Sequence, residues 1–475
     1  MSEKLWIGGR WLDAAKTFEV RNPANGEVLA EVADATSADA RRAVDAAEGA
    51  AANWASTPAP ERAKLLRRAE ALMLERADDL ARTLTLEGGK PLAEARGEIG
   101  YAASFLGWFA GEAERVYGRV IPASTGTKRL LALRQPVGIV AAITPWNFPA
   151  AMVTRKIAPA LAAGCTVVLK PAEQTPLTAL RLASVFHDAG FPPGVFNVIP
   201  TSDPKGVGAE LLSDPRVRKI TFTGSTEVGK YLAREASASV KRVSLELGGH
   251  APFIVFEDAD LAAAARGAVA SKFRNAGQTC VCANRFFVHS SVVVRFLAEL
   301  LPLVTALKVG DGLKEGVHVG PLIDQAGLDK VERHVRQATA SGARVLAGGA
   351  KPPGSGHGYF YTPTVLADVS DEMQVMREET FGPVAPVAAF ETEDEVVRRA
   401  NHGPFGLAAY LYTRDLSRAW RVAERLEYGI VGVNDPIPST AQAPFGGFKE
   451  SGLGREGGSE GMDAFLETKY VSMGI

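Results

Sequence analysis

Four short runs rich in apolar and β-branched residues decide the fold of this chain: VGIVAAIT at 137–144, TVVLK at 166–170, VFNVI at 195–199 and KITFT at 219–223. None of them alternates apolar and polar residues, and stretches with helical spacing separate them, such as AMVTRKIAPALAAG at 151–164. Strands of this kind, linked by helices, are typical of a parallel sheet covered on both faces. The sequence therefore predicts an α/β protein.

The flanking regions extend this prediction in both directions. A second α/β stretch begins near PFIVFEDAD at 252–260 and continues to about residue 446. Before the four runs, the first 120 residues have a short β-rich start and are then mainly helical in pattern. The segment KRLLALRQ at 128–135 alternates apolar and polar residues, so we expect it to form part of a hairpin that projects from the sheet.

Composition excludes several classes of function. The 475 residues include 53 Lys and Arg against 54 Asp and Glu, so the net charge of −1 does not indicate nucleic acid or an anionic membrane as partner. The first residues are too polar for a secretory signal, and no apolar run reaches the roughly 18 residues of a membrane span. Only three cysteines occur, Cys165, Cys280 and Cys282, which is typical of a reducing compartment. We expect a cytoplasmic protein.

Two glycine-rich segments could contact a nucleotide. GLGREG at 452–457 has the G-x-G-x-x-G spacing of dinucleotide-binding turns, but no strand precedes it, so we interpret it as a turn. FTGSTEVGKY at 222–231 joins a strand to a helix and resembles a phosphate P-loop. Tyr231 stands where a P-loop requires Ser or Thr, which argues against a nucleotide hydrolase. A helix that begins here would still direct its free N–H groups at a phosphate.

The segment KFRNAGQTCVCANR at 272–285 contains the candidate nucleophile, Cys280, among small and polar residues. A nucleophilic thiol needs a base, and Glu246 lies at the end of a predicted strand, one residue before two glycines. Cys282 is either a buried packing residue or the partner of Cys280 in a reversible disulfide. No second cysteine pair and no nearby histidine supports a metal site, so we expect none.

Seven motifs together resemble the aldehyde dehydrogenase superfamily. In chain order they are PWNFP at 145–149, KPAEQTP at 170–176, FTGSTEVG at 222–229, LELGG at 245–249, GQTC at 277–280, EETFGP at 378–383 and PFGGFKESGLGRE at 444–456. The resemblance implies the family's fold: a Rossmann-type cofactor domain (1–118 and 138–247), an α/β catalytic domain (248–446) and a small β oligomerisation element (119–137 and 460–475). Residues 447–459 would connect the last two.

The resemblance also implies the chemistry. Cys280 would attack the aldehyde carbon, Asn147 would stabilise the oxyanion with the Cys280 backbone N–H, and Glu246 would activate the water that releases the acid. The implied cofactor is NAD, with NADP possible, and the implied cofactor-binding residues are Trp146, Lys170, Glu173, Gly224, Ser225, Gly229, Leu247, Glu379 and Phe381. Glu173 near the adenosine 2′ position favours NAD, because a carboxylate there repels a 2′-phosphate.

Within the superfamily the chain is most similar to the succinate-semialdehyde dehydrogenase branch, through GQTCVCAN and the TRK at 154–156. Arg155 and Arg274 would grip the distal carboxylate of the substrate, with Ser439 on a facing loop. The loop NDPIPST at 434–440 departs from the pattern of that branch, because Pro436 and Pro438 stiffen it. A longer, branched or aromatic aldehyde therefore stays open as an alternative.

Three functional readings follow. The leading one is NAD(P)-dependent oxidation of a small aldehyde, most simply succinate semialdehyde, by a homodimer or homotetramer. A P-loop-type nucleotide hydrolase is the alternative from another class, and Tyr231 argues against it. A catalytically silent binding protein of the same fold is the third, and the presence of every catalytic position argues against that one.

Overall fold

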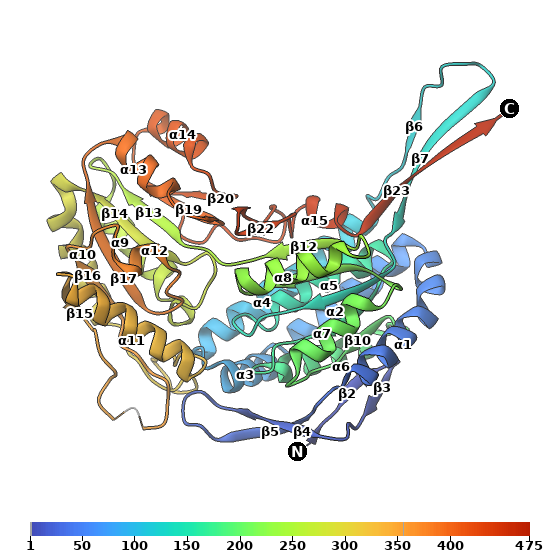
Figure 1. Ribbon diagram of the computed structural model, residues 1–475, viewed down its shortest axis with the longest axis horizontal. Coiled ribbons are helices and arrows are strands. Elements are labelled where there is room, and N and C mark those ends of the chain that lie inside the picture. The colour runs from blue at the N-terminus through green and yellow to red at the C-terminus, as the bar shows by residue number, and fades with distance from the viewer. Residues whose placement is uncertain (1, 355) are drawn as a thin grey trace.

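The predicted parallel strands form the centre of an eight-stranded sheet (Figure 1). The computed structural model describes residues 2–354 and 356–475. The strands of this sheet are β2 (Leu5–Ile7), β3 (Arg10–Leu12), β8 (Ile139–Ile143), β9 (Thr166–Lys170), β10 (Phe196–Val198), β11 (Val217–Thr223), β12 (Arg242–Glu246) and β22 (Gly452–Leu453). Their order is β22-β12-β11-β8-β9-β10-β2-β3, and the five central strands run parallel. The predicted parallel sheet is confirmed.

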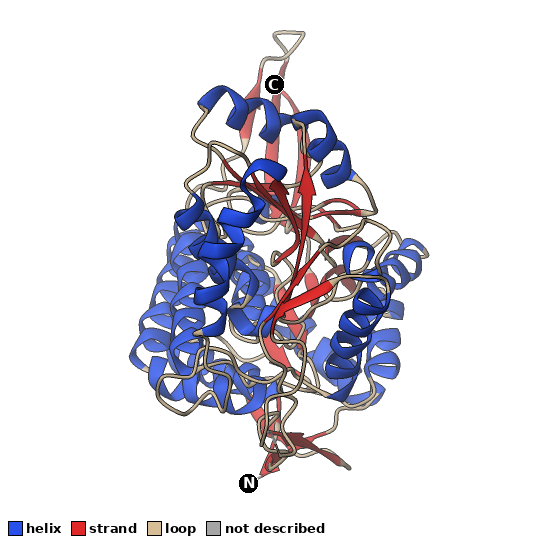
Figure 2. Ribbon diagram, turned by 90° about the vertical axis from the view of Figure 1, so that its left-hand side faces the viewer, coloured by secondary structure: helices blue, strands red, loops and turns tan. Residues whose placement is uncertain are grey.

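Helices cover both faces of this sheet, as Figure 2 shows. One face is covered by α2 (Ala59–Glu75), α3 (Ala77–Gly88), α4 (Leu92–Ala113), α5 (Ala151–Ala163) and α6 (Pro176–Ala189), and the other by α1 (Ser37–Ser56), α7 (Pro204–Ser213) and α8 (Thr226–Ser237). Each face has its own apolar core. Every residue of α5 is buried, including Arg155 and Lys156, because α4 and the sheet enclose this helix. Two cations are thus held inside the molecule.

A seven-stranded sheet carries the second α/β stretch. Its strands are β13 (Ala251–Val255), β14 (Ala283–His289), β15 (Arg344–Ala347), β16 (Thr364–Ala367), β17 (Val384–Phe390), β19 (Ala408–Tyr412) and β20 (Ile430–Val433), in the order β15-β16-β17-β14-β13-β19-β20. The accompanying helices are α9 (Leu261–Lys272), α10 (Val293–Thr305), α11 (Gln325–Ala340), α12 (Gln374–Arg377), α13 (Glu393–Asn401) and α14 (Leu416–Arg425), with 3₁₀ turns at Arg274–Gly277 and Ser290–Val292. All neighbouring strands except β15 and β16 pair in parallel.

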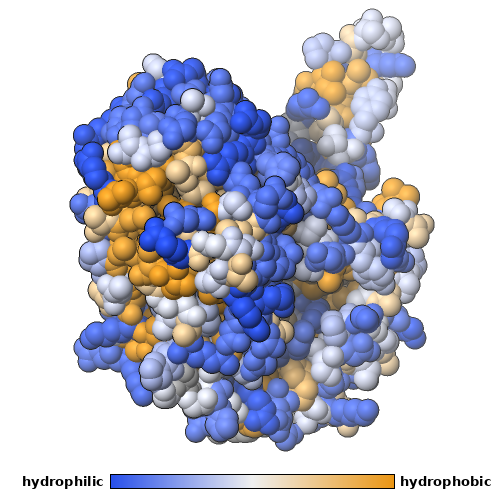
Figure 3. Space-filling model, turned by 60° about the vertical axis from the view of Figure 1, so that its left-hand side comes forward, coloured by the Kyte–Doolittle hydropathy of each residue, from blue (hydrophilic) through white to orange (hydrophobic). Residues whose placement is uncertain are grey.

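The predicted projecting hairpin is also confirmed. Strands β6 (Arg119–Ile121) and β7 (Lys128–Pro136) form the hairpin, and β23 (Leu466–Gly474) adds to it over its whole length (Figure 1). Figure 3 shows apolar side chains on this arm, at the upper right of the view. The smaller remaining strands are β1 (Ser2–Glu3), β4 (Thr17–Arg21) and β5 (Val28–Ala33) in one sheet, and β18 (Phe405–Gly406) with β21 (Phe448–Lys449) in another.

The glycine-rich segment at 444–457 links the two large sheets. β21 pairs with β18 beside the second sheet, and β22 pairs antiparallel with the end of β12. Gly452 is required at this crossing, because a Cβ atom there would lie 2.3 Å from the carbonyl oxygen of Leu245. The short helix α15 (Glu460–Asp463) follows. The crossing brings Glu456 next to the end of β12, where Glu246 lies.

No helix in the described part of the chain combines the length and the apolar character that a bilayer span requires.

Candidate active site

Three adjoining cavities lie beside the carboxyl ends of the central strands, which is where open α/β sheets bind ligands. The first, of about 780 Å³, and the second, of about 370 Å³, share Trp146 and Ser225 in their walls. The third, of about 320 Å³, contains Arg155 and Arg274. Cys280 belongs to the walls of both the second and the third cavity. The predicted nucleophile therefore stands where the two cavities meet.

Most of the predicted site residues line these cavities. The first cavity is lined by Lys170, Glu173, Gly224, Ser225 and Trp146, the second by Trp146, Asn147, Leu247, Glu379 and Phe381, and the third by Arg155, Arg274 and Ser439. Glu246 and Gly229 line none of them. Gly229 lies behind Leu247, since a Cβ atom at Gly229 would meet the Leu247 side chain at 2.3 Å. Gly229 thus allows α8 to pack closely against Leu247 in the wall of the second cavity, and it does not itself face a ligand.

The walls of the first two cavities fit a dinucleotide. Ser225 is the N-cap of α8, and its hydroxyl accepts from the backbone N–H of Val228 at 3.3 Å, so the free N–H groups of the helix start face the cavity. The hydroxyl groups of Thr223 and Thr226 are buried and have no protein partner among the described residues. Polar groups of this kind at a helix start are suited to a pyrophosphate and its ribose groups.

Glu379 and Phe381 shape the second cavity. A carboxylate oxygen of Glu379 accepts from the backbone N–H of Gly249 at 3.0 Å, and burial raises the pKa of this carboxyl to about 7. The Phe381 ring packs edge-on against Trp146, with centroids 5.5 Å apart, and Phe381 has a left-handed backbone at φ 55°. A buried carboxylate beside two aromatic rings suits a ribose hydroxyl next to a flat ring.

Lys170 and Glu173 form an ion pair across the first cavity, with 3.0 Å between Nζ and the carboxylate. Lys170 is buried at the end of β9, whereas the side chain of Glu173 is 39% exposed. The carboxylate of Glu173 is therefore partly neutralised and partly screened by solvent. Lys230, the lysine of the P-loop-like motif, turns away and pairs with Glu450 at 2.7 Å. The structure does not support a phosphate-binding lysine there.

Cys280 follows a tight loop. The backbone N–H of Cys282 donates to the Thr279 carbonyl at 2.9 Å, so the chain turns at Cys280. Burial raises the pKa of the Cys280 thiol to about 12, and the Arg155 guanidinium acts in the opposite direction. The resting thiol is thus protonated, and its use as a nucleophile requires a proton acceptor.

Cys282 points away from the cavities. Its sulfur contacts the carbonyl groups of Lys272 and Ala283 at 3.4 Å, and the residue is only 1% exposed. A turn joins the two cysteines. A disulfide between Cys280 and Cys282 would need the Cys282 sulfur to leave its contacts with the Lys272 and Ala283 carbonyl groups. Of the two readings, the structure favours the one in which Cys282 is a packing residue.

Asn147 lies just beyond the end of β8. Its side-chain N–H donates to the Gln278 carbonyl at 3.1 Å, while its own carbonyl oxygen Oδ1 is buried with no partner among the described residues. The amide nitrogen carries two hydrogens, so one N–H is left for a group bound near Cys280. Asn147 therefore has the donor that an oxyanion needs.

Glu246 ends β12 and is 2% exposed. Burial and the neighbouring Glu456 carboxylate raise the pKa of Glu246 well above its usual value, while Arg155 and Lys156 oppose this shift. One carboxylate oxygen, Oε2, has no hydrogen-bond partner among the described residues. The group is thus a carboxyl that holds a proton easily, set back from the cavity wall.

Sequence reasoning missed Glu456 as a functional residue, although the recognised motif at 444–456 ends on it. Glu456 forms a close ion pair with Lys156, and its other oxygen lies 2.8 Å from Nε of Arg155. These two cations lower the pKa of the Glu456 carboxyl. Glu456 and Glu246 therefore form a buried carboxyl pair whose pKa values are shifted in opposite directions, that of Glu456 down and that of Glu246 up.

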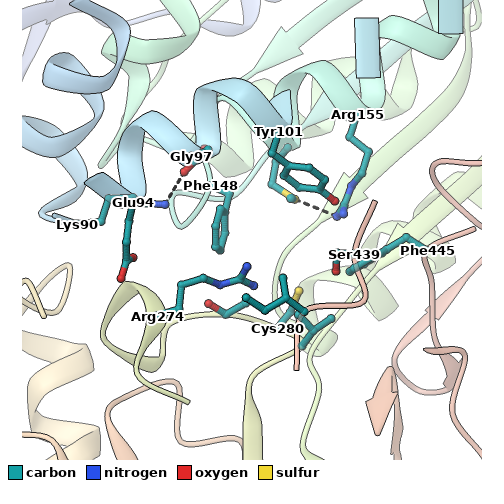
Figure 4. Close-up of a pocket in the computed structure, with 15 residues that line it drawn as sticks. Lys90, Glu94, Gly97, Tyr101, Phe148, Arg155, Arg274, Cys280, Ser439 and Phe445 are labelled. Atoms are coloured by element: carbon teal, nitrogen blue, oxygen red, sulfur yellow. Dashed lines mark hydrogen bonds and ion pairs between the residues drawn. The ribbon is translucent and has the colours of Figure 1, made fainter. Parts of the chain in front are cut away.

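The two arginines of the third cavity differ (Figure 4). Arg155 is held by Glu456, packs over the Phe445 ring at 4.0 Å and contacts the sulfur of Met152 at 3.1 Å. Arg274 forms no ion pair with any described residue, and its buried Nε has no hydrogen-bond partner. Arg155 is therefore already neutralised by Glu456, whereas Arg274 has no ion-pair partner among the described residues.

Comparisons with known proteins agree with this geometry. The model of the aldehyde dehydrogenase family matches residues 11–471. The succinate-semialdehyde dehydrogenase [NADP(+)] of Escherichia coli is 55% identical, covering 100% of this chain and 98% of the relative. The glutarate-semialdehyde dehydrogenase of Pseudomonas aeruginosa is 54% identical, covering 99% and 98%. The crystal structure of succinate-semialdehyde dehydrogenase from Burkholderia pseudomallei has a TM-score of 0.98 at 53% identity, covering 100% and 98%.

Proposed function

We propose, from the premise that this chain belongs to the aldehyde dehydrogenase family, that its substrate is a short aldehyde with a carboxylate at the far end, succinate semialdehyde first. The chain is an NAD(P)-dependent oxidoreductase that converts an aldehyde to a carboxylic acid. The single observation that supports the substrate is the guanidinium of Arg274, which forms no ion pair with a described residue and lies in the cavity that Cys280 also lines.

The first step belongs to Cys280 and Asn147. The thiol proton leaves to Glu246 in its ionised form, and the sulfur attacks the carbonyl carbon. The carbonyl oxygen then carries negative charge, which the second N–H of Asn147 and the backbone N–H of Cys280 stabilise. Removing one such donor costs about 3–4 kcal/mol in comparable sites. The product of this step is a thiohemiacetal on Cys280.

A bound nicotinamide would supply the acceptor for the hydride that leaves the thiohemiacetal carbon. This chain's residues hold the cofactor in place: Ser225 and the start of α8 at the pyrophosphate, Lys170 at the adenosine ribose, and Glu379 at the nicotinamide ribose. Trp146, Leu247 and Phe381 would exclude water from the second cavity. A thioester remains on Cys280.

Glu246 would activate water against the thioester as general base. It must first turn from its place behind the cavity wall, where Glu456 is its neighbour. Glu246 must also release the proton of the thiol to solvent; it then takes a proton from the attacking water, and its raised pKa favours that uptake. Attack of water on the thioester releases the acid and returns Cys280 to its starting state.

The third cavity would bind the distal carboxylate. Arg274 supplies the free cation, while the paired Arg155 offers the outer edge of its guanidinium, and the Ser439 hydroxyl supplies a neutral donor. The similarity to enzymes named for succinate semialdehyde and glutarate semialdehyde supports a chain of four or five carbons. The choice between the two depends on how far Arg274 lies from the reacting carbon.

The projecting arm would serve assembly into a homodimer or homotetramer. Val120 is 77% exposed and Tyr470 61% exposed on this arm. Among the described residues, β23 pairs with β7 on one edge only, so its other edge is open. Exposed apolar residues beside an open strand edge are typical of a contact with a second copy. Removal of residues 466–475 should lower the mass measured by light scattering; an unchanged mass would contradict the assignment.

A panel of aldehydes with each cofactor tests the whole proposal. Succinate semialdehyde, glutarate semialdehyde, butanal and benzaldehyde would be compared by the absorbance of reduced cofactor at 340 nm. We expect the highest kcat/KM for a carboxylated aldehyde, and no turnover in the Cys280→Ala variant. A higher kcat/KM for butanal than for either semialdehyde would refute the substrate class, and turnover by Cys280→Ala would refute the covalent mechanism.

A further inference from the structure

We infer that Asn275 is a positioning residue for the oxyanion site, because its side-chain amide ties the loop of Asn147 to the loop of Cys280. This inference rests on the proposed role of Asn147 and extends it to a residue outside the reacting groups. Asn275 does not line the cavity that contains Cys280. It acts through the backbone of its neighbours.

Three hydrogen bonds form a closed arrangement among Asn147, Asn275 and Gln278. The side-chain amide nitrogen of Asn275 donates to the backbone carbonyl of Asn147 at 3.0 Å and to the backbone carbonyl of Gln278 at 3.2 Å. The Asn147 amide nitrogen donates to the same Gln278 carbonyl at 3.1 Å. One amide thus sets the separation of the two loops, and the shared carbonyl sets the rotation of the Asn147 side chain.

That rotation decides where the second N–H of Asn147 points. With one hydrogen engaged by Gln278, the planar amide has a single remaining N–H direction. If the Gln278 carbonyl moved, both hydrogens of Asn147 would be free to turn. An oxyanion donor acts through fixed geometry, and a displacement of about 1 Å in such a site costs on the order of 10²-fold in rate.

The backbone of Asn275 is held in a conformation that L residues rarely adopt. Asn275, Ala276 and Gly277 have φ values of 49°, 55° and 75° in succession. Asparagine tolerates the left-handed region better than most residues, at a cost of about 1–2 kcal/mol for an ordinary side chain. A carboxylate oxygen of Glu94 accepts from the Asn275 backbone N–H at 2.8 Å and holds this turn. The surroundings therefore stabilise a conformation that presents the amide to both loops.

Lys90 supports the same carbonyl from the other side. The Lys90 ammonium donates to the backbone carbonyl of Asn147 at 2.8 Å. It also forms a close ion pair with Glu98, which is buried as well. Glu98 in turn accepts from the backbone N–H groups of Ala150 at 2.9 Å and Ala151 at 3.2 Å, at the start of α5. The Asn147 carbonyl is thus anchored to α4 and α5 by Lys90 and to the nucleophile loop by Asn275.

The test compares Asn275→Gly and Asn275→Ala with the control Ala276→Gly. Glycine keeps the left-handed turn without the amide, and alanine removes the amide while it leaves the loop stiff. Ala276→Gly loosens the same turn but removes no side-chain hydrogen bond. Butanal is the substrate, so that the arginines of the third cavity do not enter the comparison. Alkylation of Cys280 by iodoacetamide is measured in parallel, because that reaction needs the thiolate but develops no oxyanion.

We expect both Asn275 variants to lower kcat by about 10- to 100-fold, with the alkylation rate within about threefold of the parent. Ala276→Gly should keep kcat within about threefold. In the background of Asn147→Ala, Asn275→Gly should add less than about threefold, because its route of action is already removed. Should Asn275→Gly fail to fold, as judged by circular dichroism, the alanine variant carries the test.

Several results would overturn the inference. Equal losses in Asn275→Gly and Ala276→Gly would show that loop stiffness alone matters. A parallel fall of alkylation and turnover would show general damage to the nucleophile. If Asn147→Ala lowered kcat while both Asn275 variants kept it, this inference alone would fall. If Asn147→Ala itself kept full kcat, the proposed oxyanion role would fall and the inference with it.

Discussion

Two walls of the third cavity each contain an arginine, and the two arginines have different surroundings. Arg155 comes from α5, a helix with every residue buried, and Glu456 pairs with it at 2.8 Å. Arg274 comes from a loop with left-handed backbone, and no described residue forms an ion pair with it. The same residue type is thus ion-paired on one wall and has no ion pair with a described residue on the other. Burial beside an acid, not residue type, decides which role an arginine has.

The largest expected effect concerns Glu246, which ends β12 and neighbours the Glu456 that pairs with Arg155. Glu246→Gln should lower kcat by about 10²- to 10⁴-fold, because it removes general-base catalysis of thioester hydrolysis. Since reduced cofactor forms before that step, a burst at 340 nm followed by a slow phase should appear in stopped-flow traces. A steady state without a burst at the parent rate would exclude Glu246 as base.

The raised pKa of Glu246 also predicts a gain in stability in the same variant. A folded pKa above the unfolded value means that the folded state binds more protons, so stability falls as pH rises from the usual carboxyl range toward the folded pKa. Glutamine does not ionise, so the variant does not lose stability in this way as the pH rises. The apparent Tm of Glu246→Gln should therefore exceed that of the parent by about 2 °C at pH 8, and by less at pH 5. A lower Tm at pH 8 would contradict this sign.

The second prediction removes the counter-ion on the α5 wall. Arg155→Met should destabilise the fold by about 3 kcal/mol, because it leaves a buried carboxylate with Lys156 as its single cation. The apparent Tm in a thermal scan should fall by about 3 °C, because the entropy of unfolding of a chain of this length is about 1 kcal/mol/K. The matched control is Arg274→Met, whose Tm should change by less than about 2 °C. Equal changes of Tm in the two variants would contradict the proposed difference between Arg155 and Arg274.

The third prediction concerns the free arginine. Arg274→Ala should lower kcat/KM for succinate semialdehyde by about 10- to 150-fold, the value of a lost charged hydrogen bond of about 1.5–3 kcal/mol. The rate for butanal, which has no carboxylate, should change by less than about threefold. Initial rates for both aldehydes give the comparison directly.

Ser439→Ala provides a graded control on the facing loop, since it removes a neutral donor; its loss should be about threefold with succinate semialdehyde. If Arg274→Ala slowed both aldehydes by the same factor, the arginine would be structural. The assignment of a carboxylated substrate would then lose its support.

The smallest effect concerns the cofactor cavity. NAD should give a kcat/KM about fivefold higher than NADP, because the partly exposed Glu173 repels a 2′-phosphate while Lys170 offsets part of that repulsion. Glu173→Gln should shift the ratio toward NADP by about threefold at low salt, and less at high salt. The relative from Escherichia coli is named for NADP, so this measurement is informative in either direction. A higher kcat/KM with NADP than with NAD in the parent would refute the preference.

The sequence was sufficient for the architecture and for selecting Cys280 as the candidate nucleophile, for local reasons. Apolar runs without alternation can only be stable in a sheet covered on both faces, and β8 to β11 have that arrangement. Cys280 stands out through its neighbours along the chain. Sequence reasoning also identified Asn147 and Glu246, although through the family resemblance and not through spacing. Their geometry could not be read from the chain.

Tertiary structure decided the electrostatics. Glu456 is separated from Arg155 by about 300 positions, yet the crossing at Gly452 puts them in contact, and no pattern along the chain shows this pairing. Lys90 and Asn275 were missed for the same reason, because their partner is a backbone carbonyl far away in sequence. A sequence records which groups can be charged or can donate. Whether a group is neutralised, desolvated or free depends on neighbours within a few ångströms, and only the folded chain supplies those neighbours.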